Sequence, residues 1–448
     1  MTMGSIVDVV IANVKEKNGE ASLFAQAVEE VLESVEPILK KRPDLVDSYV
    51  LPLLVEPERI ISFRVPWVDD EGVTHVNTGY RCQFNSAIGP YKGGLRFSPE
   101  VSVDEVKFLA FEQTFKNALT GLPIGGAKGG ADFDPIGKSD MEIMRFCQSF
   151  MNELYRHIGP VTDVPAGDIG VGKREIGYMY GQYKKLTNRV EGTLTGKSPV
   201  DGGLVGREEA TGYGVVFFAR EMLAYHQDDL TAKEVVLSGY GNVAWGAAKK
   251  LNELGAKVIT ISGLEGFIHD PEGISGEKVD FMREIRYGDK TLADFVEKFP
   301  SATFYPNEQP WHVSGDIYMP CATQNEIGQI EAEAIAKSRG QYIVEGSNMP
   351  LTREATHILK VAGKMIAPFK AANAGGVACS VYEMAQNASF IPTAEAQVYA
   401  QLEILMKNIH QTCVEVCEAY QLPYDLNVGA NLAAFERVAE AMLAQGIV

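Results

Sequence analysis

The sequence predicts an α/β protein with two domains. Its 448 residues exceed what a single hydrophobic core usually serves. After residue 208, strand-like segments alternate with helix-like segments, a pattern typical of βαβ units in a parallel sheet. A stretch rich in Gly, Ser and Thr at 190–208 separates this pattern from the first part of the chain. We therefore expect one domain over 1–200 and a second over 201–424, with a helix at about 425–448 that returns to the first domain.

Composition limits the class of protein and of partner. Apolar residues make up 46% and charged residues 22% of the chain, as in ordinary globular proteins. Asp and Glu number 59 against 41 Lys and Arg, and the net charge of -18 argues against binding to nucleic acid or anionic membranes. The N-terminus lacks a signal-peptide pattern and no apolar run reaches the roughly 18 residues of a membrane span, so a cytoplasmic protein is expected. Six cysteines without a C-x-x-C pair or a histidine at ligand spacing predict buried thiols and no metal site.

The first half of the chain is expected to contain helices, a hairpin and another helix, in that order. Apolar residues at helical spacing near the start predict two amphipathic helices. β-Rich runs at 58–70 and 74–88 are separated by the turn signal DDEG, which predicts a β-hairpin. The segment 103–119 has one apolar side and is expected to be a helix, on which Gln113 and Lys116 share another face.

In the second half of the chain, predicted helices alternate with predicted strands. Helices are expected at 209–225 and 242–254. Short apolar runs rich in β-branched residues predict the strands between and after them. These predicted strands lie at 234–241, 257–263, 316–321 and 341–348.

A glycine motif joins the first of these strands to the helix that follows. The sequence GYGNVA comes directly after an apolar strand and opens the helix, so backbone N–H groups and the positive end of the helix would face a pyrophosphate. An ordinary tight turn between strand and helix is the alternative. The setting favours dinucleotide binding in a Rossmann-like domain. The expected cofactor-binding residues of this turn are Gly239, Tyr240, Gly241, Asn242 and Val243.

The next strand suggests which dinucleotide is bound. It ends in ISGLEG, where Glu265 could accept hydrogen bonds from the ribose hydroxyls and would repel a 2′-phosphate. No Arg or Lys follows closely in the sequence. NAD is therefore the expected cofactor, with NADP as the alternative.

Three lysines precede an isolated acid in the first half of the chain. Lys92 and Lys128 are flanked by glycines, which let backbone approach a small ligand, while Lys116 lies on the predicted helix. Because the chain is acidic overall, these cations indicate a locally basic site for an anion. Asp168 follows them in the sequence. A P-loop is excluded because the residue after Lys128 is glycine rather than Ser or Thr. Alternatives are an exposed lysine at Lys128, an exposed pair of Glu112 with Lys116, and a turn residue at Asp168.

Several motifs, spread over nearly the whole chain, resemble those of a known family. NTGYRCQFNSAIGPYKGGLRF, FEQTFKNALTGLPIGGAKGGADFDP, VPAGDIGVG, GYGNVAWGAAKK, MPCATQNEI and KAANAGGVACSVYEMAQN are similar to segments of the hexameric glutamate dehydrogenases, within the Glu/Leu/Phe/Val dehydrogenase superfamily. The resemblance implies an α/β substrate and oligomerisation domain, a Rossmann-like cofactor domain, and a cleft between them that closes for hydride transfer. It also implies a homohexamer.

The resemblance assigns roles to individual residues. Lys92 with Ser380 would bind the distal carboxylate of glutamate, and Lys128 with Asp168 would transfer protons. The other substrate-binding residues implied are Gln113, Lys116, Ala166, Thr195, Asn373 and Val377. Thr211 and Asn348 would join the glycine-turn residues and Glu265 in binding the cofactor.

The implied reaction converts glutamate to 2-oxoglutarate and ammonium, reversibly. Hydride leaves Cα for NAD, water activated by Lys128 adds to the iminium, and Asp168 passes protons to and from the nitrogen. A partly desolvated lysine near other cations has a pKa below its usual value of roughly 10.4, which suits this role. Tyr240 is larger than the serine common in NADP-linked members, which again favours NAD. Alternatives are an NADP-linked enzyme, a dehydrogenase for another amino acid such as leucine or phenylalanine, and a non-catalytic nucleotide-binding scaffold.

Overall fold

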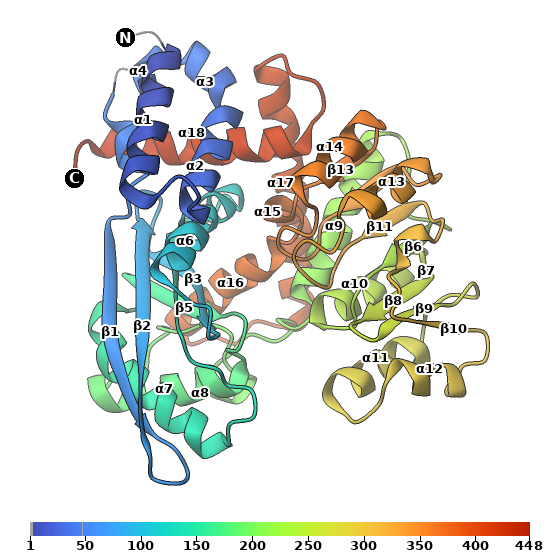
Figure 1. Ribbon diagram of the computed structural model, residues 1–448, viewed down its shortest axis with the longest axis horizontal. Helices are drawn as coiled ribbons and strands as arrows, with labels where there is room; N and C mark the ends of the chain where they lie inside the picture. The colour runs from blue at the N-terminus through green and yellow to red at the C-terminus, as the bar shows by residue number, and fades with distance from the viewer. Residues whose placement is uncertain (1–2, 47) are drawn as a thin grey trace. The chain divides into compact units, whose positions relative to one another are not determined.

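The computed structural model describes residues 3–46 and 48–448, and these form two compact units (Figure 1). Unit 1 contains the described residues up to Val205 together with Ser380–Ala394 and Asn431–Val448. Unit 2 contains Gly206–Cys379 and Glu395–Ala430. Each unit is described by itself below.

Unit 1 begins with more helices than the two that were predicted. Five helices occupy the described residues before the first strand, and prolines mark the start of two of them. Pro37 lies in the first turn of one helix and Pro43 begins the next, where the missing N–H has no intrahelical partner to lose. The helices are α1 Met3–Asn18, α2 Leu23–Ser34, α3 Glu36–Lys41, α4 Pro43–Val46 and α5 Val50–Leu54.

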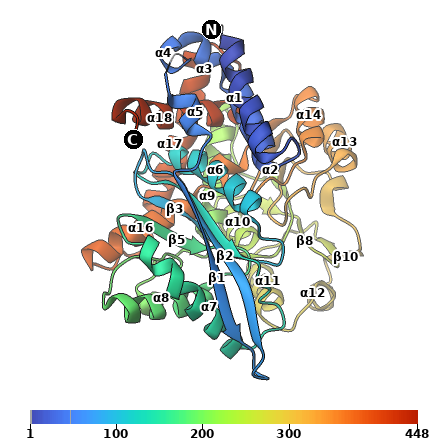
Figure 2. The same ribbon diagram turned by 60° about the vertical axis from the view of Figure 1, so that its left-hand side comes forward.

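The sheet of unit 1 is mixed, with strand order β1-β2-β4-β3-β5. The predicted hairpin is confirmed: β1 and β2 pair antiparallel from Val68↔Thr74 to Arg59↔Gln83, and Figure 2 shows this long hairpin from the side. The other three strands were not predicted, because β3 and β4 contain several glycines and β5 contains a proline and a glycine, residues that are depleted in strands. β3 is parallel to both β4 and β5. The strands are β1 Arg59–Val68, β2 Thr74–Asn85, β3 Tyr91–Phe97, β4 Gly125–Ala131 and β5 Asp163–Gly167.

The glycines of β3 and β4 allow close approach of backbone and helix. A Cβ at Gly93 would lie 1.6 Å from the carbonyl oxygen of Ala127, and one at Gly126 would lie 2.0 Å from the Thr114 hydroxyl. The helix α6, Val103–Leu119, which carries Thr114, has the bounds expected from the sequence. Glycine is therefore required here for packing, even though its propensity argues against a strand.

A cluster of buried aromatic and aliphatic side chains forms a core of unit 1 between its strands and two of its helices. Phe133 and Phe146 stack with ring centroids 3.7 Å apart, and Phe97 meets Phe146 edge to face. The helices α7 Asp140–Leu154 and α8 Lys173–Thr187 contribute to this core. The last helix, α18 Leu426–Gln445, joins unit 1 from Asn431 onward, and its Arg437 donates hydrogen bonds to the carbonyl groups of Ala118 and Gly121.

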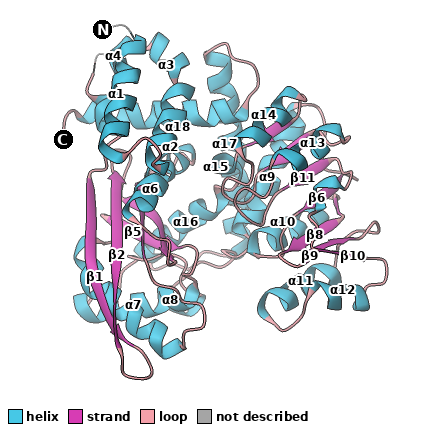
Figure 3. Cartoon of the chain, in the orientation of Figure 1, coloured by secondary structure: helices cyan, strands magenta, loops and turns pink. Residues whose placement is uncertain are grey.

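Unit 2 contains the predicted parallel sheet, with strand order β13-β12-β11-β6-β7 (Figure 3). The predicted alternation of strands and helices is confirmed, although each strand is shorter than expected. The strands are β6 Glu234–Leu237, β7 Lys257–Val258, β11 Ile317–Met319, β12 Tyr342–Val344 and β13 Met365–Ala367. The helices are α9 Ala210–Tyr225, α10 Asn242–Glu253, α11 Glu277–Tyr287, α12 Leu292–Lys298, α13 Gln329–Lys337, α14 Arg353–Val361, α15 Phe369–Ala372, α16 Gly375–Ser389, which continues into unit 1, and α17 Glu395–Ala419.

The single strand expected over 257–263 was wrong. After β7 the chain forms β8 Thr260–Gly263, which pairs antiparallel with β9 Gly266–His269 in a second sheet completed by β10 Thr303–Pro306. The break occurs because the Thr260 hydroxyl takes the place of a backbone partner. It accepts a hydrogen bond from Leu237 N and donates one to Leu237 O, both at 2.9 Å. Thr260 therefore satisfies the end of β6 while its own backbone turns to another sheet.

Across the described part of the chain, no helix combines the length and apolar character needed to cross a membrane. The same residues hold no group of three or more His, Cys, Asp or Glu side chains placed to bind a metal ion. All six cysteines are buried, and none forms a disulfide bond.

Candidate functional site

Two of the predicted lysines lie on neighbouring parallel strands of unit 1. Lys92 on β3 is paired in register with Gly126 on β4, two residues before Lys128. Both side chains are buried, with 1% of Lys92 and 5% of Lys128 exposed. The reading of Lys128 as an exposed surface lysine is therefore excluded. Burial of a cation has an energetic cost unless a partner offsets it, so the partners of these lysines define the site.

Lys128 lies against the predicted acid Asp168. Its Nζ is 3.1 Å from Asp168 Oδ2, and the same oxygen accepts a hydrogen bond of 2.8 Å from Arg96 Nε. Arg96 also donates to Glu105 Oε1 at 2.5 Å. The cluster thus alternates cations and carboxylates. Arg96 lies in the motif GPYKGGLRF but was not predicted as a site residue, because no neighbouring residue in the sequence indicates its partner.

The electrostatics of this cluster suit proton transfer. Burial lowers the pKa of Lys128, the charge of Asp168 opposes that shift, and the charge of Arg96 adds to it. Burial acts to raise the pKa of Asp168, but the charges of Lys128 and Arg96 outweigh it and hold that pKa at about 2. At neutral pH Asp168 is therefore a carboxylate. Lys128, whose pKa is lowered overall, loses its proton more readily than an exposed lysine.

Lys92 contacts Thr195, another of the residues expected to bind substrate. Lys92 Nζ donates a hydrogen bond of 2.8 Å to the Thr195 hydroxyl. Thr195 N donates to the carbonyl of Pro165 at 3.0 Å, so Thr195 lies alongside β5 next to Ala166, another predicted residue. Ser380 is also buried and belongs to the same unit.

An amide on α6 connects the two lysine-bearing strands and was missed from sequence. Asn117 Nδ2 donates to the carbonyl of Lys92 on β3 at 3.0 Å and to that of Gly125 on β4 at 2.6 Å. The predicted residue Gln113, one turn earlier, donates from Nε2 to Asn117 Oδ1 at 2.7 Å. Lys116, the neighbour of Asn117, is half-buried. Gln113 and Lys116 thus lie on α6, the helix that is hydrogen-bonded to the strands of Lys92 and Lys128.

The other predicted residues lie in unit 2. Asn373 donates from Nδ2 to Asn348 Oδ1 at 2.9 Å and to the carbonyl of Gly346 at 3.1 Å, so two predicted asparagines are in contact. Among the described residues, Asn373 Oδ1 is buried without a hydrogen-bond partner, which suits a ligand that donates. Thr211, in the first turn of α9, lies against Gly376, where a Cβ would be 2.6 Å from the Thr211 hydroxyl. Val377 is the next residue along the chain.

The predicted glycine turn lines a cavity of about 620 Å³ in unit 2. Gly239 has a left-handed φ of +85°, which favours glycine, and Gly241 begins α10 without a side chain to cap it. The open helix end therefore faces the cavity with its backbone N–H groups, an arrangement that fits a pyrophosphate. All five predicted turn residues line the cavity. The other lining residues, which were missed, are Ser262, Gly263, Leu264, Arg286, Gln309, Cys321, Ala322, Thr323 and Glu326.

Glu265 lies at the edge of this cavity. Thr211, Glu265 and Asn348 are not among the residues that line it. A Cβ at Gly263 would lie 2.5 Å from both Glu265 Oε2 and a ring carbon of Tyr240, so the carboxylate lies close to the lining. The inference that no basic residue is near was incomplete: Arg286, on α11, lines the same cavity. Arg286 comes more than 20 residues after the strand, and the sequence gives no local sign that it returns to the cavity.

Comparisons with known proteins agree with this geometry. The family model for glutamate/leucine/phenylalanine/valine dehydrogenases matches residues 202–446, and the model for the dimerisation domain of the same enzymes matches 57–185. The chain is 52% identical to the NAD-specific glutamate dehydrogenase of Clostridium symbiosum over 99% of this chain and 100% of that protein. It is 47% identical to the NADP-specific glutamate dehydrogenase of Giardia intestinalis over 99% of each protein. A solved glutamate dehydrogenase superposes with a TM-score of 0.96 at 52% identity, covering 99% of both chains. The chain therefore belongs to the glutamate/leucine/phenylalanine/valine dehydrogenase family.

Proposed function

We propose that this protein is an NAD-linked glutamate dehydrogenase, which converts L-glutamate to 2-oxoglutarate and ammonium reversibly. The observation that carries the proposal is the pair of buried lysines on adjacent strands, one against the Thr195 hydroxyl and the other against the Asp168 carboxylate. One lysine can bind a substrate carboxylate while the other exchanges protons. The NAD-specific glutamate dehydrogenases among the relatives support the same substrate and cofactor.

Substrate recognition rests on cations and hydroxyls of unit 1. Lys92, with the hydroxyls of Thr195 and Ser380, binds the distal carboxylate. Gln113 and Lys116 on α6 bind the α-carboxylate and so orient the Cα–H bond. Ala166 and Val377 line the aliphatic part of the substrate. A substrate without a distal carboxylate would leave a buried cation without its anion, which explains a preference for a dicarboxylate over leucine or phenylalanine.

Lys128 and Asp168 carry the proton transfers. Asp168, a carboxylate at neutral pH, accepts a proton from the substrate ammonium. After hydride has left Cα, Lys128 removes a proton from water as the water oxygen bonds to Cα of the iminium. Asp168 then returns its proton to the nitrogen, the C–N bond breaks, and the hydroxyl proton passes to the departing ammonia, which gives ammonium and the 2-oxo acid. Lys128 releases the proton that it took from water to the solvent. The lowered pKa of Lys128 lets it act as the base in this step.

NAD, when bound, supplies the hydride acceptor. The turn Gly239–Val243 and the start of α10 would hold its pyrophosphate, and Glu265 would accept from the ribose hydroxyls. Thr211, Asn348 and Asn373 would contact its nicotinamide side. NADP stays the alternative because Arg286 lines the same cavity and could pair with a 2′-phosphate.

Assembly and location are also part of the proposal. We propose a homohexamer that acts in the cytoplasm. A hetero-hexameric glutamate dehydrogenase from Thermus thermophilus is among the solved relatives, at 25% identity and a TM-score of 0.81. Sedimentation at six times the mass of one chain would support the hexamer, and a monomer or dimer at working concentration would contradict it.

Initial rates with four substrate pairs test the function. Glutamate and leucine are each offered with NAD and with NADP, and formation of the reduced cofactor is followed by its absorbance. We expect the highest rate with glutamate and NAD. A higher rate with leucine would favour a dehydrogenase for another amino acid, and cofactor binding without turnover would favour a non-catalytic scaffold.

A further inference from the structure

A buried carboxylate on α16 lies one helical turn after Ser380 and has no role in the steps above. Glu383 is fully buried, and Lys197, its ion-pair partner at 2.7 Å, has 1% of its side chain exposed. Glu383 Oε2 also accepts a hydrogen bond of 2.9 Å from Gly196 N, while Oε1 accepts from Lys197 N at 3.4 Å. One carboxylate therefore holds two successive backbone N–H groups and an ammonium.

These contacts shape the turn that carries Thr195. Lys197 Nζ donates to the carbonyl of Leu194 as well as to Glu383, so the turn closes on itself around Thr195. Gly196, held by Glu383, has a left-handed φ of +87°. The Thr195 hydroxyl, at the centre of this turn, accepts the hydrogen bond from Lys92. Glu383 thus fixes the residues on the C-terminal side of Thr195, whose hydroxyl contacts Lys92.

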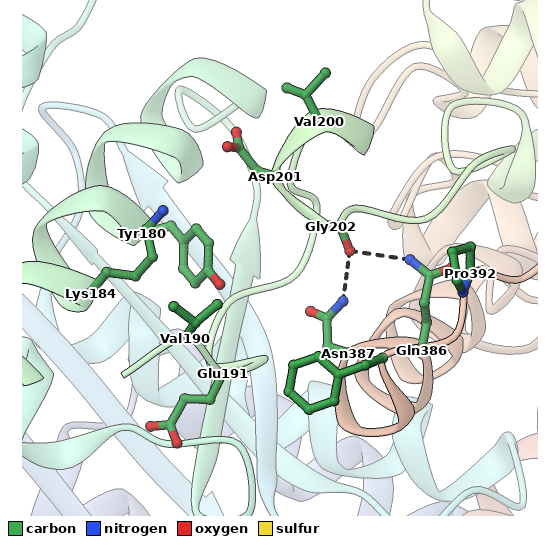
Figure 4. A pocket seen from close by; sticks show the side chains of 11 residues that line it. Tyr180, Lys184, Val190, Glu191, Val200, Asp201, Gly202, Gln386, Asn387 and Pro392 are labelled. Carbon is green, nitrogen blue, oxygen red and sulfur yellow. Dashed lines mark hydrogen bonds between the residues drawn. The ribbon is translucent and has the colours of Figure 1, made fainter. Parts of the chain in front are cut away.

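The same helix holds the chain further along. Gln386 Nε2 and Asn387 Nδ2 donate to the carbonyl of Gly202 at 3.2 and 2.7 Å, and these two hydrogen bonds are drawn in Figure 4. Ser380, Glu383 and Gln386 follow one another at a spacing of three residues, which keeps them near one face of the helix. This face therefore lies along the 193–203 segment. Glu383 contacts this segment next to Thr195, whereas Asn387 contacts it at Gly202.

We propose that Glu383 is a positioning residue, which fixes the Thr195 hydroxyl relative to Ser380 around Lys92 and so sets the preference for a substrate with a distal carboxylate. The inference rests on the proposed function, because it assigns the Lys92 pocket to that carboxylate. Breaking the Glu383–Lys197 pair leaves the turn without its anchor. Thr195 then loses its fixed place, while Lys128 and Asp168, which hold each other and Arg96, keep theirs.

The test compares glutamate with norvaline, a five-carbon amino acid that lacks the distal carboxylate. Steady-state kcat and KM are measured with NAD for the full-length protein and for Glu383→Gln. We expect KM for glutamate to rise about tenfold with kcat changed less than about twofold, while kcat/KM for norvaline stays within about twofold. An equal loss on both substrates, or no loss on either, would overturn the inference, because a merely structural role does not distinguish them.

Two further variants make the result decisive. Lys197→Met combined with Glu383→Gln removes both buried charges together, so it can fold where the single variant leaves Lys197 unpaired. It should show the same selective loss on glutamate, with thermal unfolding as the check of folding. Asn387→Ala loses the contact with Gly202. Its ratio of kcat/KM for glutamate to kcat/KM for norvaline should equal that of the parent protein. If the parent protein itself fails to favour glutamate over norvaline, the proposed function fails. If the parent favours glutamate and the variants keep that preference, only the role of Glu383 fails.

Discussion

The proposed substrate site of unit 1 and the proposed cofactor cavity of unit 2 are built in different ways. In unit 1, buried side chains from separate strands and a helix meet, and their charges adjust one another, as for Lys128, Asp168 and Arg96. In unit 2, the predicted contacts come from a glycine turn and the start of α10, so backbone N–H groups face the ligand. Substitution of one side chain should therefore abolish chemistry in unit 1, whereas unit 2 should respond most to changes in backbone conformation.

The largest expected effect follows from removal of the proton-transfer lysine. Lys128→Ala should lower kcat/KM for glutamate by about a thousandfold or more, because the water step loses its base. NADH affinity should stay within about twofold, since Lys128 is not among the residues that line the cofactor cavity. Steady-state rates and NADH fluorescence titration measure the two quantities. An equal loss of kcat/KM and of NADH affinity would contradict the assignment of Lys128 to proton transfer rather than to cofactor binding.

The next effect concerns the backbone of the cofactor turn. Gly239→Ala places a Cβ on a residue with φ of +85°, 3.1 Å from the carbonyl oxygen of Cys321. The strain of about 1–2 kcal/mol should weaken NADH binding about tenfold, while the glutamate site of unit 1 keeps its geometry. Fluorescence titration checks the affinity. Gly363→Ala is the matched control, because Gly363 also has a left-handed φ, +73°, but does not line the cavity. An equal loss of NADH affinity in that variant would show that strain inside the cofactor turn is not the cause.

A smaller effect is expected where β6 meets β8. Thr260→Val keeps the shape of the side chain but removes the hydroxyl that bonds to both backbone groups of Leu237. The free energy of unfolding should fall by about 1–3 kcal/mol, because two buried backbone groups lose their partner. Denaturant titration measures it. Unchanged stability would contradict the account of why the strand divides.

The smallest expected effect is a shift in the pH profile. The charge of Arg96 acts to lower the pKa values of both Lys128 and Asp168, so Arg96→Gln should raise both. In the proposed mechanism both groups work in their deprotonated forms. The acid limb of log kcat/KM against pH should therefore move to higher pH, with a smaller change on the alkaline side. A move to lower pH, or no move, would contradict the coupling of the three groups.

The features that the sequence predicted were local ones. The hairpin, α6, the glycine turn and the lysines in their glycine-rich motifs can be recognised from neighbouring residues. Arg96 was missed because Asp168 lies 72 residues away, and Glu383 was missed because its contact with Gly196 spans 187 residues. The break after β7 depends on a side chain that replaces a backbone partner, which apolar patterning does not reveal. β3 and β4 were missed because packing against α6 overrides the low strand propensity of glycine.

The central claim is that the buried ammonium of Lys92 binds the distal carboxylate of glutamate, and Lys92→Met tests it most directly. The variant keeps the length of the side chain without its charge. We measure kcat/KM with NAD for glutamate and for norvaline, beside NADH affinity. The account predicts that the preference for glutamate falls by a hundredfold or more, on the order of 3 kcal/mol, with NADH affinity retained. An unchanged preference for glutamate in a folded variant that binds NADH would contradict it.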